Sequence, residues 1–156
     1  MKRILVTGAG GQIGSWLVPR LREEYGTSAV MATDVRHLGP EVTEAGPFQV
    51  LDATDKKAVG QAVMRHGADT VYHLAAILSA IGEKDPRLAW HVNMESLEAV
   101  LEVAREQKCA VFTPSSIGVF GPDTPKDPTP QDTIMRPATM YGITKVSGEL
   151  LCDYYH

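Results

Sequence analysis

The fold of this chain is decided by the stretch Thr7-Gly8-Ala9-Gly10-Gly11-Gln12-Ile13-Gly14. It follows the apolar run Arg3-Ile4-Leu5-Val6, which predicts a buried parallel strand, and it leads into apolar residues at helical spacing: Ile13, Trp16, Leu17 and Leu21. Glycines let the backbone approach a ligand closely, and a helix N-terminus offers unpaired N–H groups to a phosphate. We therefore expect a dinucleotide pyrophosphate to bind through Gly8, Gly11, Gln12, Ile13 and Gly14.

The composition is that of an ordinary globular protein, with 156 residues, 44% of them hydrophobic and 22% charged. The net charge of −4 gives no electrostatic reason to expect nucleic acid or a membrane as a partner, and no apolar run could span a bilayer. Because Met1 lies next to the first strand, we expect no targeting peptide and a cytoplasmic location. Neither the histidines nor Cys109 and Cys152 have metal-ligand spacing, so we expect reduced thiols and no metal.

Strand and helix patterns alternate along the rest of the chain. Strands are predicted at 29–33, 48–51, 70–74 and 110–113, and helices at 55–66, 86–106 and from Thr139 onward. Loops are expected at 35–46 and 77–85, and a proline-rich loop before Thr139 is long enough to suggest a function such as a substrate cover. This order predicts a doubly wound parallel α/β sheet, a Rossmann-like fold, with one NAD-binding domain over residues 1–156.

Residues at the ends of the predicted strands would complete the cofactor site. Asp34 lies about twenty residues after Gly14, where a carboxylate is expected to accept hydrogen bonds from the ribose, although it could simply be a turn residue. Its charge would repel a 2′-phosphate, which favours NAD over NADP, whereas the nearby Arg36 could hold that phosphate. The ribose and nicotinamide are expected to lie against the end of the fourth strand, at Leu74, Ala75 and Ala76.

Tyr141 and Lys145 form the candidate proton-transfer pair, because a separation of four residues puts them on one face of the last predicted helix. Free tyrosine, with a pKa near 10, is a poor base at neutral pH, but a lysine ammonium one turn away favours the phenolate. A phenolate can take the proton of a substrate alcohol while hydride leaves for NAD. Ser116, at the end of the fifth strand, is placed to hold the same hydroxyl.

Together these features resemble the short-chain dehydrogenase/reductase superfamily. Its glycine spacing is matched by Gly8, Gly11 and Gly14, and its tyrosine–lysine motif by Tyr141-Gly142-Ile143-Thr144-Lys145. The chain as a whole is similar to the extended branch, that of the NAD-dependent epimerases and dehydratases. It most resembles the short-chain type of L-threonine 3-dehydrogenase, through residues 73–80 (HLAAILSA), 119–122 (VFGP) and 129–135 (TPQDTIM).

This resemblance implies NAD-dependent oxidation of L-threonine at C3 to 2-amino-3-ketobutyrate. It implies that Tyr141 is the base, that Lys145 tunes it, and that the substrate hydroxyl is anchored by Ser116 together with Ser115. It further implies that Ser79 helps to bind the amino acid and that Asp52, with Ala53 beside it, contacts the adenine. Asn93 would belong to the cofactor site and support the surroundings of the tyrosine, while a purely structural asparagine stays open.

Other functions also stay open. Dehydratases of this branch carry an acidic pair where Ile117 and Gly118 stand here, which argues against elimination chemistry. Family members are about twice as long, so we expect the C-terminal strands and substrate domain to be missing, the fifth strand to be an uncovered edge, and NAD binding to be more robust than turnover. A sugar-nucleotide epimerase and a non-catalytic NAD-binding module remain alternatives. The helices at 86–106 and 139–155 could form a homodimer interface or pack within the chain.

Overall fold

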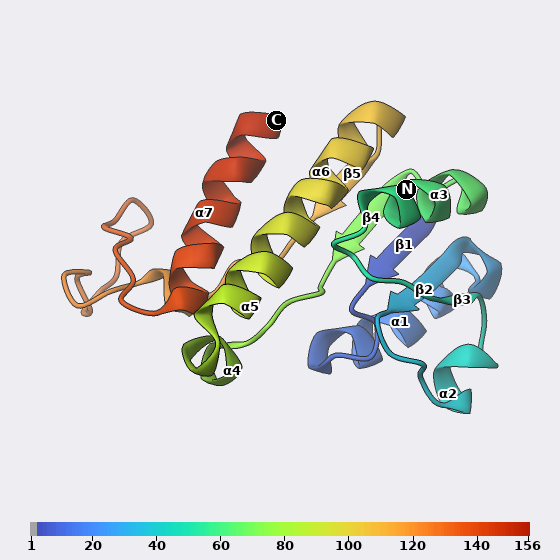
Figure 1. Ribbon diagram of the computed structural model, residues 1–156, viewed down its shortest axis with the longest axis horizontal. Helices are drawn as coiled ribbons and strands as arrows, with labels where there is room; N and C mark the ends of the chain where they lie inside the picture. The colour runs from blue at the N-terminus through green and yellow to red at the C-terminus, as the bar shows by residue number, and fades with distance from the viewer. Residues whose placement is uncertain (1–2) are drawn as a thin grey trace. The chain divides into compact units, whose positions relative to one another are not determined.

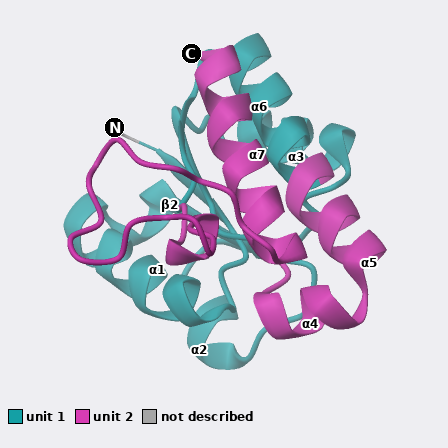
Figure 2. Ribbon diagram, turned by 90° about the vertical axis from the view of Figure 1, so that its left-hand side faces the viewer, with its two compact units in different colours: residues 1–75, 96–114 teal, residues 76–95, 115–156 magenta. Residues whose placement is uncertain are grey.

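The structure, a computed structural model, describes residues 3–156 (Figure 1). These residues form two compact units, which Figure 2 shows in different colours. Unit 1 contains the described residues up to Ala75 together with Ser96–Pro114, and unit 2 contains Ala76–Glu95 and Ser115–His156. The single domain that the sequence predicts over residues 1–156 stays a prediction.

Unit 1 is built on a parallel sheet of five strands with the order β3-β2-β1-β4-β5. The strands are β1 (Ile4–Thr7), β2 (Val30–Asp34), β3 (Phe48–Val50), β4 (Thr70–His73) and β5 (Ala110–Phe112). In the described part of the chain β5 pairs with β4 alone, so it is the edge strand that the sequence predicts. Parallel pairing brings the carboxyl ends of β1, β2 and β4 to one edge, where ligands bind in open α/β sheets.

Helices cover both faces of this sheet, because the side chains of β1 alternate between two apolar cores. Leu5 packs with residues of α3 (Lys56–His66) and α6 (Ser96–Gln107), whereas Ile4 and Val6 pack with residues of α1 (Gln12–Tyr25). The α/β prediction is confirmed: unit 1 has the doubly wound, Rossmann-like arrangement.

The helix predicted after the glycine turn is present as α1, and one local prediction for unit 1 was wrong. On α1 the buried positions are Gly14, Val18, Leu21 and Arg22, whereas the Trp16 side chain is 82% exposed. The four buried residues lie on one stripe of the helix, and Trp16 projects from the other side. The predicted loop at 35–46 contains a short helix, α2 (Pro40–Thr43), which begins at a proline, a residue suited to the first helical turn.

Unit 2 is largely helical and differs from the prediction at two places. The predicted loop at 77–85 contains α4 (Ser79–Lys84). The predicted helix at 86–106 is interrupted, because α5 (Pro86–Trp90) is followed by a π-helical turn, η2 (His91–Glu95), before α6 begins. Such π turns often occur at functional sites. The unit also contains a short 3₁₀ turn, η3 (Ile117–Val119), and the long helix α7 (Met140–Tyr155).

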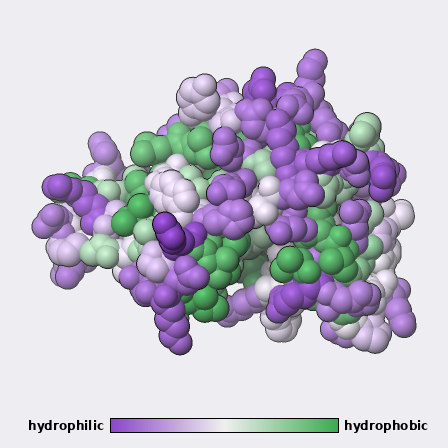
Figure 3. All heavy atoms as spheres, in the orientation of Figure 1, coloured by the Kyte–Doolittle hydropathy of each residue, from purple (hydrophilic) through white to green (hydrophobic). Residues whose placement is uncertain are grey.

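Hydrophilic residues cover much of the face seen in Figure 3, with apolar patches between them. On α7 the exposed apolar side chains Ile143, Leu150 and Tyr154 follow one another at helical spacing. Across residues 3–156, none of the helices is both long and apolar enough to cross a bilayer. The homodimer stays a prediction.

Candidate active site

The glycine turn of unit 1 packs tightly between β4 and α1. Gly8 has a φ of +67°, and a Cβ there would lie 2.7 Å from the backbone nitrogen of Ala75. A Cβ on Gly14 would lie 2.5 Å from the carbonyl oxygen of Gly8. Gly11 is the N-cap of α1, and no side chain of the described residues caps this helix end. The first N–H groups of α1 are therefore suited to an anion, and the turn fits the pyrophosphate of a dinucleotide.

The carboxylate of Asp34 lies beside this turn, at the end of β2. Its Oδ2 accepts a hydrogen bond from the Gly10 N–H at 2.9 Å, and its Oδ1 accepts from the backbone N–H and Nε of Arg36, each at 3.0 Å. Burial alone would raise the pKa of Asp34, but these hydrogen bonds and the charge of Arg36 lower it below its ordinary value. The Asp34 side chain is 5% exposed. Arg36, which could hold a 2′-phosphate, is instead paired with this carboxylate at 3.0 Å.

Other predicted cofactor residues of unit 1 lie at the ends of β3 and β4. Asp52 is exposed, and its Oδ1 accepts hydrogen bonds from the backbone N–H and hydroxyl of Thr54, at 2.9 and 2.8 Å. Ala53 is buried in the core on the α3 side of the sheet. Leu74 and Ala75 follow β4, and both are partly buried.

A buried polar network beneath the turn was missed by sequence reasoning. His73 Nδ1 lies 2.9 Å from the Thr7 hydroxyl, and its Nε2 lies 3.1 Å from the Ser96 hydroxyl. Thr7 Oγ1 also accepts a hydrogen bond from the Ala75 N–H at 3.4 Å. The network therefore links the ends of β1 and β4 to the start of α6. Its only sequence signal is that these polar residues stand at the ends of apolar strands and a helix.

In unit 2, Asn93 joins the π turn to two other segments. Its Oδ1 accepts from the Ile77 N–H at 2.7 Å, and its Nδ2 donates to the Ile77 carbonyl at 3.1 Å and to Thr144 Oγ1 at 3.0 Å. The Thr144 hydroxyl donates in turn to the carbonyl of Tyr141 at 2.8 Å. Asn93 therefore supports the helix that carries the tyrosine, as the resemblance implies, and both of its amide hydrogens are already used. These bonds favour the purely structural alternative for Asn93, and the direct contact with the cofactor that the resemblance implies is untested.

Tyr141 and Lys145 lie together on the first turns of α7. Lys145 Nζ lies 5.7 Å from the centre of the Tyr141 ring, within the range of a cation–π contact. Burial lowers the pKa of Lys145, because its ammonium loses hydration. Thr139 is the N-cap of α7, and its hydroxyl oxygen accepts from the Gly142 N–H at 3.0 Å, which fixes where the helix starts and therefore the positions of Tyr141 and Lys145 on it.

Ser116 lies close to the Tyr141 ring in the same unit. A Cβ on Gly118 would lie 3.4 Å both from Ser116 Oγ and from Tyr141 Cε1, so these groups flank one glycine. Ser116 Oγ accepts from the Gly118 N–H at 3.1 Å, which leaves the hydroxyl hydrogen of Ser116 to donate to a ligand.

The two remaining serines of the prediction have different surroundings. The Ser115 hydroxyl donates its hydrogen to the carboxylate of Glu149. The role of Ser115 as a second anchor of the substrate hydroxyl stays a prediction. Ser79 is the exposed first residue of α4. That helix is attached to α7 through Glu83, whose carboxylate accepts from the Met140 N–H at 2.7 Å.

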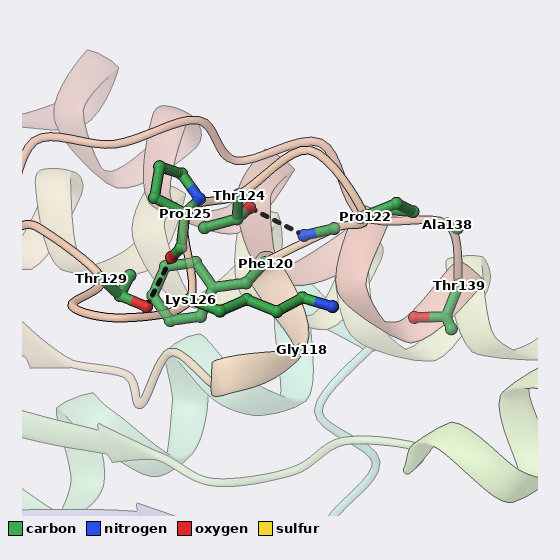
Figure 4. A pocket seen from close by; sticks show the side chains of 10 residues that line it. Gly118, Phe120, Pro122, Thr124, Pro125, Lys126, Thr129, Ala138 and Thr139 are labelled. Carbon is green, nitrogen blue, oxygen red and sulfur yellow. Dashed lines mark hydrogen bonds between the residues drawn. The ribbon is translucent and has the colours of Figure 1, made fainter.

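The proline-rich loop forms a cavity of about 490 Å³ within unit 2 (Figure 4). The extended side chain of Lys126 directs its amino group away from the Thr129 end of this cavity. Gly118 and Thr139 line the cavity, and both adjoin Tyr141, since Gly118 packs on its ring and Thr139 caps its helix. The loop therefore lies beside the candidate base, as expected of a substrate cover, although that role is still a prediction.

The predicted residues thus fall into two groups. Unit 1 brings together the glycine turn, Asp34, Leu74 and Ala75, and unit 2 brings together Asn93, Ser116, Tyr141 and Lys145. Ala76 opens unit 2. Among residues 3–156 no cluster of three or more histidine, cysteine or acidic side chains could hold a metal ion.

Two features of the chain are typical of enzymes that bind a dinucleotide cofactor. One is a Rossmann-like unit with a glycine turn and a carboxylate at a strand end, and the other is a later helix with a tyrosine–lysine pair. The chain belongs to the NAD dependent epimerase/dehydratase family, whose model matches residues 4–156. An uncharacterized epimerase/dehydratase from Staphylococcus saprophyticus is 55% identical over 158 residues, which cover 99% of this chain and 49% of that relative.

Solved structures give a finer comparison. The L-threonine dehydrogenase from Clostridium difficile is 53% identical with a TM-score of 0.97, over all of this chain and 49% of that one. A UDP-glucose 4-epimerase from Thermotoga maritima is 28% identical with a TM-score of 0.89, over 98% of this chain and 50% of that one. The chain therefore spans about half the length of these relatives, as the resemblance implies.

Proposed function

We propose that this chain carries the cofactor-binding and proton-transfer residues of an NAD-dependent L-threonine 3-dehydrogenase. The main support is the arrangement around Tyr141 on α7. Lys145 lies over the Tyr141 ring, and Ser116, from the segment before η3, lies beside the ring with a hydrogen to donate. The similarity to an L-threonine dehydrogenase, at 53% identity against 28% for the sugar-nucleotide epimerase, supports threonine as the substrate.

The chain's own residues account for binding and for the proton. The N–H groups at the start of α1 hold the pyrophosphate, and the Asp34 carboxylate accepts from the ribose hydroxyls. Ser116 donates to the oxygen of the C3 hydroxyl and orients it, and Tyr141, the assigned base, accepts its proton beside the positive charge of Lys145. When bound, NAD supplies the acceptor for the hydride that leaves C3, so that the C–O single bond becomes the carbonyl of 2-amino-3-ketobutyrate.

NADH formation from L-threonine and NAD tests this assignment. We expect Tyr141→Phe to lower turnover at least about a hundredfold, the usual effect of losing a general base, with NAD affinity nearly unchanged. Tyr154→Phe is the matched control, since it removes a hydroxyl from the same helix at an exposed position and should leave turnover intact. Unchanged threonine turnover in Tyr141→Phe would refute the assigned base.

The same samples separate the alternatives. Interconversion of UDP-glucose and UDP-galactose without threonine-dependent NADH would assign the tyrosine to a sugar-nucleotide epimerase. NAD binding without either activity would assign a non-catalytic binding module. Because the cradle in unit 1 consists mostly of backbone groups, we expect NAD binding to outlast turnover on storage and in variants, and parallel loss of both would count against this proposal.

A further inference from the structure

We propose that Glu149 is a positioning residue, whose carboxylate holds Ser115 and thereby places Ser116 against Tyr141. This role deepens the proposed function and rests on it, because Ser116 and Tyr141 are the groups assigned to the substrate. Glu149 follows Lys145 by four residues on α7 and Tyr141 by eight, so the three side chains share one stripe of the helix. The Ser115 hydroxyl donates to Glu149 Oε1 across 34 residues of sequence.

The segment from Ser115 to Gly118 is held on α7 at both of its ends. At one end Ser115 is attached to Glu149. At the other end Gly118 packs on the Tyr141 ring, where a Cβ would lie 3.3 Å from Cδ1, and its carbonyl oxygen approaches so closely that a Cβ on Gly142 would collide with it. The two attachments are about 12 Å apart along the helix axis, at ~1.5 Å per residue. Ser116 lies between them in the sequence, so we expect a shift of Ser116 to weaken one of the two.

The hydrogen bonds of Ser115 and Ser116 suggest different roles for the two residues. Ser115 has one hydroxyl hydrogen, and Glu149 accepts it. Ser116 Oγ accepts from the Gly118 N–H, which fixes the oxygen and leaves its hydrogen for the substrate. A carboxylate is a stronger acceptor than a neutral group, so Glu149 suits the anchoring task. Ser115 is exposed, so we expect this bond to order its segment rather than to stabilise the whole fold.

Amide hydrogen exchange of the full chain, followed by NMR, tests this role without depending on turnover. The reporter is the Gly118 amide, which donates to Ser116 Oγ. In Glu149→Ala and in Ser115→Ala we expect this amide to exchange about tenfold faster, and no faster in the double variant, because one bond is lost in all three. Glu149→Gln should stay within about threefold of wild type, since its amide oxygen also accepts. Asp153→Ala, which removes an exposed carboxylate from the same helix, is the control.

Kinetics supply the second readout. We expect Glu149→Ala to lower kcat for threonine about tenfold with the KM for NAD unchanged, and Glu149→Gln to restore most of it. Wild-type exchange at Gly118 in Glu149→Ala, equal acceleration along all of α7, or failure of the glutamine rescue would each overturn the positioning role. Absence of threonine turnover in the wild-type chain would instead sink the proposed function, while the exchange data would still decide whether Glu149 orders this segment.

Discussion

Replacement of Asn93 by alanine is the most direct test of how unit 2 is held together. Asn93 is 8% exposed, and its amide makes three hydrogen bonds, two to the backbone of Ile77 and one to the Thr144 hydroxyl. At a net value of about 1 kcal/mol for each bond, the substitution should lower the free energy of unfolding by about 3 kcal/mol. Water entering the vacated space would reduce this loss, and stranded partners would increase it.

The two tryptophans make this measurement specific, because each unit contains one. Trp16 lies on α1 in unit 1, and Trp90 ends α5 in unit 2, three residues before Asn93. In a Trp16→Phe background, Trp90 fluorescence during urea unfolding reports on unit 2, and the 82% exposure of Trp16 makes that background change mild. The exposed Gln131 offers a control, since Gln131→Ala removes a side-chain amide and should change the free energy of unfolding by less than about 0.5 kcal/mol.

Two results would refute this reasoning. A loss below about 1 kcal/mol at an unchanged m-value would mean that the three bonds contribute little to stability. A more than about tenfold loss of NAD affinity in a protein of wild-type stability, or about 1.4 kcal/mol of binding free energy, would mean that Asn93 contacts the cofactor itself. We expect Asn93→Ala to bind NAD within about threefold of wild type wherever it is folded.

Further predictions concern unit 1. Gly14→Ala would place a Cβ 2.5 Å from the Gly8 carbonyl oxygen and should cost about 2–3 kcal/mol of stability and most NAD binding. Gly60→Ala, in α3 with no neighbour nearer than 3.6 Å, should stabilise by about 0.5–1 kcal/mol, so equal losses in the two variants would contradict this reading. The pKa of His66 is lowered, first by burial and then by the charge of Arg3. Its unfolded form therefore binds more protons, so stability should fall as the pH drops below about 6.5, and His66→Gln should flatten that loss in urea titrations at several pH values.

The sequence predicts the sheet and the glycine turn well because both depend on local signals. Four-residue apolar runs, strand-end polar residues and glycines each specify a conformation without reference to distant parts of the chain. The short helices α2 and α4 were not predicted, because helices of four to six residues have no stability of their own and form only through tertiary packing. The π turn was not predicted either, because nothing in the sequence of His91–Glu95 breaks the pattern of an ordinary α-helix.

The sequence indicates some residues of the candidate site but not the contacts that these residues make. Spacing alone named Tyr141, Lys145 and Asp34, because the chemistry demands particular residue types at fixed separations. The structure places Lys145 at the Tyr141 ring and Asp34 at the glycine turn, and their roles stay predictions. The pairing of Asp34 with Arg36 required the folded structure, since the sequence allowed the arginine to hold a phosphate instead. Glu149 shows the limit most clearly. Its spacing from Lys145 was visible, but the role that we propose for it depends on its contact with Ser115, and contacts over such separations leave no local signal.

The proposed cofactor-binding part and the proposed substrate-binding part depend on different kinds of contact, so substitutions should affect them differently. The cofactor cradle consists mainly of backbone N–H groups and close glycine contacts, which most substitutions elsewhere cannot remove. The substrate side depends on side-chain bonds that attach other segments to successive turns of α7: Glu83 at Met140, Asn93 at Thr144 and Ser115 at Glu149. Each of these attachments is lost in a single substitution, whereas the helix and its tyrosine persist. A family with this construction can keep one cofactor while its members change substrate, which is consistent with a dehydrogenase and an epimerase sharing the same fold.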